Sequence, residues 1–113
     1  MEIVEKKLDN VNILCLSGRL DAYSSTELEK KLESLIKASQ PHVVIDFQNL
    51  EYISSSGLRV LLMALKKTRK LEGDIKLACM QSFIKEVFDM AGFSQLFNIF
   101  DTDEAAVRHF IEA

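Results

Sequence analysis

Two short strand-like runs open the chain, over residues 2–8 and 11–17. Such runs of apolar and polar residues, bounded by turn residues, are typical of β-strands. Asp9 and Asn10 stand between them, and both residue types tolerate the left-handed backbone conformation of a tight turn. The pattern predicts an antiparallel β-hairpin at the start of the chain.

Apolar residues then recur at helical spacing in two longer segments. The first predicts an amphipathic helix over about 25–38. A capping box is expected at its start, in which the Ser24 oxygen accepts hydrogen bonds from the amides of the first turn. The second predicts a helix over about 56–71. Its last turns carry a basic cluster between Lys66 and Lys70, where cations suit the negative end of the helix dipole.

Two shorter helices are expected in the last third of the chain. Ser82 is the expected cap of the third helix, which Gly92 ends, and Thr102 is the expected cap of the closing helix. The residues expected to face inward are Phe83, Val87 and Phe88 in the third helix and Val107, Phe110 and Ile111 in the closing one.

The run over residues 42–47 is apolar on both faces, which favours a central strand covered by helices on both sides. Further strands are expected over 74–79 and 97–100. Strands that alternate with helices imply right-handed crossovers and a parallel sheet. We therefore expect an α/β fold: a mostly parallel central sheet with an antiparallel N-terminal hairpin strand, flanked by four helices.

The composition fits one globular domain over residues 1–113, since 48% of residues are apolar and 27% charged. The net charge of −3 provides no basic field for nucleic acid or an anionic membrane surface. The apolar stretches are far shorter than the roughly 20 residues that span a bilayer, and the N-terminus lacks the pattern of a signal peptide. We expect a cytoplasmic protein.

Cys15 and Cys79 lie in apolar runs and are expected to be small buried thiols. His42 and His109 are isolated from each other and from the cysteines. No metal site and no cofactor is therefore predicted. The chain also lacks a Gly-rich dinucleotide loop and a Gly-x-Ser-x-Gly nucleophile motif, so we expect no enzymatic activity.

Functional sites in such sheets usually lie in the loops beyond the carboxyl ends of the strands, here residues 18–24 and 51–57. The second loop carries three consecutive serines, Ser54 to Ser56, and then Gly57. A helix cap and a tight turn would explain one serine and the glycine. The extra hydroxyls lie where helix amides attract anions, which suggests phosphorylation.

The stretch from Asp46 to Leu58, with Gly18 to Asp21 upstream and Phe88 to Phe93 downstream, resembles the STAS domain of bacterial anti-sigma-factor antagonists. The resemblance covers essentially the whole chain. It implies a partner switch, in which the unphosphorylated protein binds an anti-sigma factor that is also a serine kinase and so frees the sigma factor. Phosphorylation reverses this binding, and a serine phosphatase restores it.

The resemblance implies that Ser55 is the phosphoacceptor, with Ser56 as the neighbouring hydroxyl and Gly57 as the turn residue. The family's usual aspartate falls on Ser54, which removes a carboxylate from the site. Asp21 matches the carboxylate of the companion loop beside the acceptor. The residues expected to contact the partner are Asp21, Tyr23, Ser24, Ser54, Ser56, Gly57, Leu58 and Arg59.

Several of these residues have a second interpretation. Asp21 is also suited to hydrogen-bond its own turn. Tyr23 is either an exposed interface aromatic or a half-buried one, and Arg59 either assists docking or is a solvated helix side chain. For the whole protein, the alternative is a STAS scaffold or an accessory module of a sensory or transport complex, without phosphoswitching.

Overall fold

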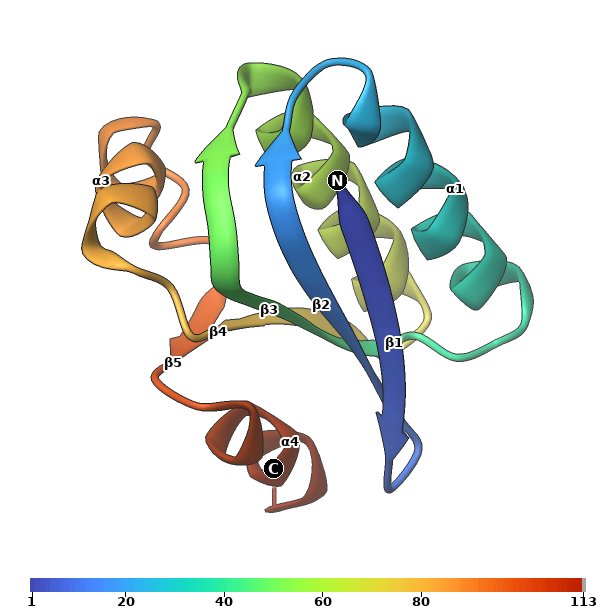
Figure 1. Ribbon diagram of the computed structural model, residues 1–113. Helices are drawn as coiled ribbons and strands as arrows, with labels where there is room; N and C mark the ends of the chain where they lie inside the picture. The colour runs from blue at the N-terminus through green and yellow to red at the C-terminus, as the bar shows by residue number, and fades with distance from the viewer. Residues whose placement is uncertain (113) are drawn as a thin grey trace.

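Five β-strands pair in the order in which they occur along the chain and form one sheet (Figure 1). The computed structural model describes residues 1–112; residue 113, the last of the expected domain, lies outside the described residues. The strands β1 and β2 pair antiparallel, and the other neighbours pair in parallel. The strands are β1 (Glu2–Leu8), β2 (Val11–Leu20), β3 (His42–Ile53), β4 (Asp74–Ala78) and β5 (Asn98–Phe100).

The opening hairpin has the predicted turn. Leu8 pairs with Val11 across it, and the two turn residues, Asp9 and Asn10, have φ angles of +51° and +67°. Only a few residue types enter this left-handed region readily, and aspartate and asparagine are among them. The hairpin prediction is confirmed.

The strands β2 and β3 both extend further than the sequence pattern indicates. The strand β2 continues past Ser17 to Leu20, and β3 continues past Phe47 to Ile53. Their register shifts twice, once between Cys15 and Ser17 and once beside Gly18, which has a φ of +97°. Irregularities of this kind break the regular alternation of side chains, so the pattern alone ends each strand too early.

Four helices cover the two faces of the sheet. The helices α1 (Ser24–Lys37), α2 (Ser55–Lys70) and α3 (Ser82–Met90) pack on one face, and α4 (Asp103–Glu112) packs on the other. The strand β3 buries side chains on both sides, since Ile45 faces the three helices and Val44 faces α4. The predicted α/β architecture and the double cover of the central strand are therefore confirmed.

The helix α3 differs from its prediction by a shift of one position. Ser82 is the first residue of the helix and makes no capping hydrogen bond. The cap position belongs to Gln81, whose carbonyl accepts the amides of Ile84 and Lys85. The inward position belongs to Ile84, which is buried, while Phe83 is 44% exposed. The expectations of a Ser82 cap and an inward Phe83 are therefore wrong.

The closing helix α4 follows its prediction more closely. Thr102 caps it, since its Oγ1 accepts the Ala105 amide at 3.1 Å. Val107 is buried and Phe110 half-buried, stacked on the His42 ring at 4.9 Å between ring centroids. Ile111 is 57% exposed, so its expected inward position is wrong. The helix presents only a narrow apolar stripe to the sheet.

Candidate functional site

The three serines occupy the junction between β3 and α2, and each has a different role. The strand ends at Ile53 and the helix begins at Ser55, so the connection is Ser54 alone. Ser54 has an extended backbone, and its hydroxyl oxygen accepts the Gly57 amide at 3.1 Å. This is the geometry of a helix N-cap. The one serine that a helix cap explains is therefore Ser54, which leaves Ser55 free of that role.

Ser55 is exposed and Ser56 half-buried. Within residues 1–112, neither hydroxyl has a hydrogen-bond partner, whereas Ser54 is engaged through its side chain and through its amide, which donates to Leu20. The backbone amides of residues 55 and 56 lie in the first helical turn, which has no intrahelical acceptors for them. An accessible hydroxyl therefore lies beside free donors and the positive end of the helix dipole, which favour an anion.

Gly57 is required by a close approach of α2 to the strand ends. A Cβ atom there would lie 2.8 Å from Cδ2 and Cγ of Leu20 and 3.2 Å from Cγ1 of Ile53. Leu58, the next residue, is only 8% exposed and packs in the core. Both residues therefore lie beneath the segment Ser54 to Ser56, here called the serine loop, and support it. They offer little surface of their own.

The companion loop between β2 and α1 is joined to the serine loop by backbone. The Ser54 amide donates to the Leu20 carbonyl at 2.9 Å, and the ends of β2 and β3 lie side by side at one edge of the sheet (Figure 1). Residues 18–24 and the serine loop therefore form one continuous surface. The sequence argument from strand ends is sufficient to find this surface.

Asp21 and Ser24 hold the companion loop together. One carboxylate oxygen of Asp21 accepts the Ser24 amide at 2.9 Å. Hydrogen bonds from Ser24 to this carboxylate lower the pKa of Asp21. The Ser24 hydroxyl accepts the Asp21 amide at 2.9 Å and donates to the Arg19 carbonyl at 2.7 Å. Asp21 therefore does hydrogen-bond its own turn, the second of its two interpretations.

The predicted capping box at Ser24 is wrong. Ser24 is the first residue of α1 and is 4% exposed, so its hydroxyl points back into the loop and away from the first-turn amides. The carboxylate of Asp21, three residues earlier, accepts the amide of Ser24 itself, and α1 has no side-chain cap. An aspartate at this spacing forms such turns as readily as serine, so the sequence offered two candidates.

Tyr23 and Arg59 are both exposed near the serine loop. Tyr23 is 80% exposed, which excludes the half-buried interpretation. Arg59 lines a groove of about 210 Å³ between the first turns of α1 and α2, together with Ser56 and Glu29. An exposed aromatic beside a shallow groove is typical of a protein-binding surface.

Arg19 and Tyr52 form a further feature at this edge, which the sequence analysis does not include. They are paired across β2 and β3, and the Arg19 guanidinium carbon lies 4.2 Å from the centre of the Tyr52 ring. Cation–π contacts of this kind fix the orientation of both side chains. The pairing depends on the register shifts between β2 and β3, so no local sequence signal indicates it.

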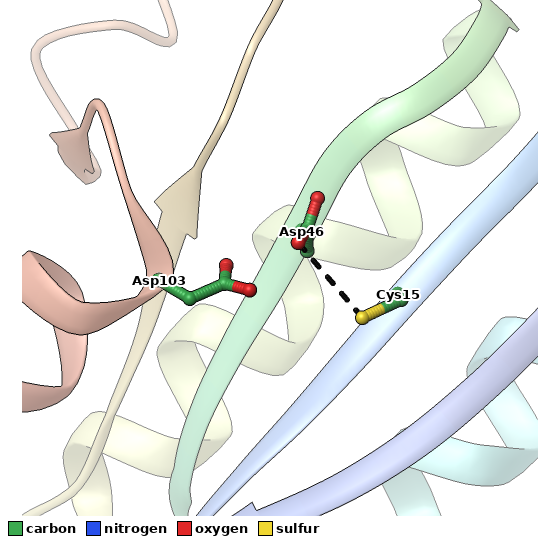
Figure 2. Close-up of side chains that lie close together, drawn as sticks. All are labelled: Cys15, Asp46 and Asp103. Carbon is green, nitrogen blue, oxygen red and sulfur yellow. Dashed lines mark hydrogen bonds between the residues drawn. The ribbon is translucent and has the colours of Figure 1, made fainter.

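A second group of polar side chains lies on the other face of the sheet, beside α4 (Figure 2). The donor atoms of Cys15, Asp46 and Asp103 all lie within 4.8 Å of one another, and the Cys15 Sγ is 3.9 Å from an Asp46 oxygen. These residues are far apart in sequence, and only the strand pairing brings them together. No local sequence pattern therefore predicts that these three residues lie together.

Burial and neighbouring carboxylates keep the thiols of Cys15 and of Cys79 protonated. Burial, and then the charge of Asp46, raises the pKa of Cys15, and the same causes raise the pKa of Cys79 to about 12. The Cys79 thiol hydrogen-bonds to Asp103 at 3.7 Å. Both cysteines are half-buried, less than the sequence predicts. The thiols act as hydrogen-bond donors to the carboxyl groups.

Comparison with known proteins identifies the chain. Residues 2–106 match the STAS domain. The chain belongs to the STAS domain family. It is 34% identical over 110 residues to BtrV of Bordetella bronchiseptica, described as a candidate anti-sigma factor antagonist, and the match covers 97% of this chain and 95% of that protein. The membership predicted from the sequence is confirmed, and the 34% identity over nearly the whole chain places it among the anti-sigma factor antagonists of this family, a class of regulators.

Solved structures share the fold. An anti-sigma factor antagonist from Mycobacterium paratuberculosis has a TM-score of 0.86 at 22% identity, covering 96% of this chain and 92% of that one. The Bacillus cell fate determinant SpoIIAA in its phosphorylated form has a TM-score of 0.77 at 18% identity, covering 96% and 99%. Within residues 1–112, no helix has the length and apolar character needed to cross a membrane.

Proposed function

We propose that the chain is a cytoplasmic partner switch controlled by phosphorylation of Ser55. In the unphosphorylated form it binds an anti-sigma factor that is also a serine kinase, and the sigma factor is released. The kinase transfers the γ-phosphoryl group of ATP to the Ser55 oxygen, which loses its proton, and ADP leaves. A serine phosphatase removes the group and restores binding.

One observation supports Ser55 above its neighbours. The hydroxyl of Ser54 is occupied by the Gly57 amide, and Ser56 is half-buried in the groove, whereas Ser55 is exposed and unengaged within the described residues. A hydroxyl that must reach the γ-phosphate of a kinase-bound nucleotide needs this accessibility. The amides of the first helical turn then stabilise the added negative charge.

The proposed partner surface surrounds this hydroxyl. Its exposed or half-buried members are Asp21, Tyr23, Ser54, Ser56 and Arg59, while Ser24, Gly57 and Leu58 support it from within. Tyr23 has the exposure of an anchoring aromatic, and such residues contribute a large share of binding energy in many interfaces. That residues 1–113 act as one domain stays a prediction.

The loss of partner binding on phosphorylation follows from the charge that the phosphoryl group adds. A phosphoserine adds about −1.5 to −2 charges. In the interface, that charge loses part of its hydration unless the partner supplies cations, which costs several kcal/mol. A loss of about 2.7 kcal/mol already weakens binding roughly a hundredfold. No conformational change of the domain is needed to release the partner.

The test begins with capture of the partner. Ser55→Ala protein, which the kinase cannot modify, is used to retain proteins from an extract of the source cells, and Ser56→Ala is the matched control. We expect a histidine-kinase-like ATPase among the retained proteins. When this ATPase is given ATP and the unaltered chain, fragmentation of the product should place one phosphate on Ser55.

Two results would contradict the proposal. Phosphate on Ser54 or Ser56 would show that the acceptor is misassigned. Stable complexes without an ATPase, and no phosphorylation, would favour the alternative, a STAS scaffold or accessory module of a sensory or transport complex.

A further inference from the structure

Arg59 is a cation one helical turn from the proposed phosphoacceptor. It lies four residues after Ser55 and three after Ser56 on α2, and its side chain is exposed. Residues three and four apart are neighbours on a helix surface. Among residues 1–112, Arg59 takes part in no ion pair, so its guanidinium is available to another anion.

The direction of the side chain favours contact with the first turn of α2. In an α-helix each Cα–Cβ bond tilts toward the N-terminus, so a long side chain covers the turn that precedes its own Cα. For Arg59 that turn carries Ser55 and Ser56, and Ser56 shares the groove with Arg59. An arginine side chain that follows this tilt comes within reach of a phosphoryl group on Ser55, four residues earlier.

The charges around the groove are few. Glu29, on α1, is the other charged residue in its lining, and it does not form an ion pair with Arg59 within the described residues. An arginine binds a phosphoryl group through two parallel N–H···O hydrogen bonds, stronger than those it forms with a neutral acceptor. A phosphoryl dianion also carries more charge than the single carboxylate of Glu29.

The geometry points to Arg59 as the residue that binds the phosphoryl group of phosphorylated Ser55, with the amides of residues 55 and 56 as further donors. This inference rests on the proposed function, because it takes Ser55 as the acceptor. Arg59 holds the group against the helix and favours its doubly charged form, the form that most opposes partner binding.

The second pKa of the phosphoserine measures this contact directly. Phosphoserine is installed at residue 55 during synthesis of the protein, and the phosphorus resonance is followed by NMR from pH 4.5 to pH 8. A phosphoserine normally titrates near pH 6. In Arg59→Gln we expect its pKa to rise by about 0.5 pH unit, because the cation that favours the dianion is lost. Arg59→Lys should recover part of this shift.

Lys66→Gln is the matched control. It removes the same charge from the same helix, but 11 residues from Ser55, or about 16 Å along the axis. The phosphoserine pKa should then stay within about 0.1 pH unit, since solvent and salt screen a charge at that distance. An equal phosphoserine pKa with and without Arg59, or an equal shift in Lys66→Gln, would overturn the inference.

The outcome is independent of the test of the proposed function. Since the phosphoserine is installed during synthesis, no kinase is needed to observe its contact with Arg59. A kinase product with phosphate on another serine would refute the acceptor assignment, but it would not alter the pKa measured for the installed phosphoserine. If Arg59→Gln does not shift that pKa, and the kinase product carries its phosphate on Ser55, only the role of Arg59 is refuted.

Discussion

At residue 54 a serine stands where the resemblance leads one to expect an aspartate, and its hydroxyl caps α2. We expect Ser54→Ala to lower the free energy of unfolding by about 1 kcal/mol, because the Gly57 amide loses its acceptor. Ser54→Asp should keep the stability, since aspartate is an equally good cap, yet change the rate of Ser55 phosphorylation by adding a charge beside the acceptor. Urea denaturation and a timed kinase assay measure the two effects. Equal phosphorylation rates for Ser54→Asp and the unaltered chain would contradict the second part.

Gly57 provides a second prediction at this scale. We expect Gly57→Ala to lower the free energy of unfolding by about 1–2 kcal/mol, because its Cβ would overlap the buried Leu20 side chain. This loss outweighs the gain of up to about 1 kcal/mol that alanine brings to a helix. Ser55→Ala is the control, since it adds alanine two residues earlier at an exposed position. A Gly57→Ala protein as stable as the control would show that Leu20 moves aside without cost.

The helix α4 responds to pH through its first residue, Asp103. Burial, and then the neighbouring carboxyl of Asp46, raises the pKa of Asp103 to about 6, against about 3.9 in an unfolded chain. Between about pH 4 and 6 the native protein keeps a proton that the unfolded chain has released. The stabilisation from this group is therefore complete below pH 4 and is lost as the pH rises toward 6.

Asp103→Asn should remove this pH dependence. We expect the stability of the variant, relative to the unaltered chain, to improve by about 1 kcal/mol from pH 4.5 to pH 7, a value reduced for the partial exposure of Asp103. Glu104→Gln changes the same charge in the same turn and should show no such trend. Urea denaturation at the two pH values measures both. A constant difference for Asp103→Asn would show that the fold does not raise the pKa of Asp103.

The elements also show what the sequence could predict. The hairpin turn at Asp9 and Asn10 and the cap at Thr102 depend on interactions within three or four residues, and both predictions are confirmed. The predicted capping role of Ser24 is wrong, because its hydroxyl can bond to the first helical turn or to the preceding loop, and only the fold decides between these partners. The Cys15 and Asp103 group depends on strand pairing and on the position of α4, so no local pattern contains it.

The molecule as a whole should keep its fold when Ser55 is phosphorylated. The added charge lies at an exposed helix N-terminus, where dipole, amides and Arg59 favour it. We expect amide NMR spectra of the two forms to coincide outside residues 18–24 and 52–62, while partner affinity falls at least about a hundredfold. Shifts that extend through α4 would contradict a local mechanism, and equal affinities would contradict the switch.

The order of the strands in the sheet equals their order along the chain. Each new strand therefore pairs with the one before it, and Leu20 meets Ile53 only 33 residues later. The sheet can grow in one direction as the ribosome releases the chain, without waiting for a distant segment to return. We therefore expect the edge that carries the serine loop to form early, when β2 and β3 pair, and α4 to cover the opposite face last.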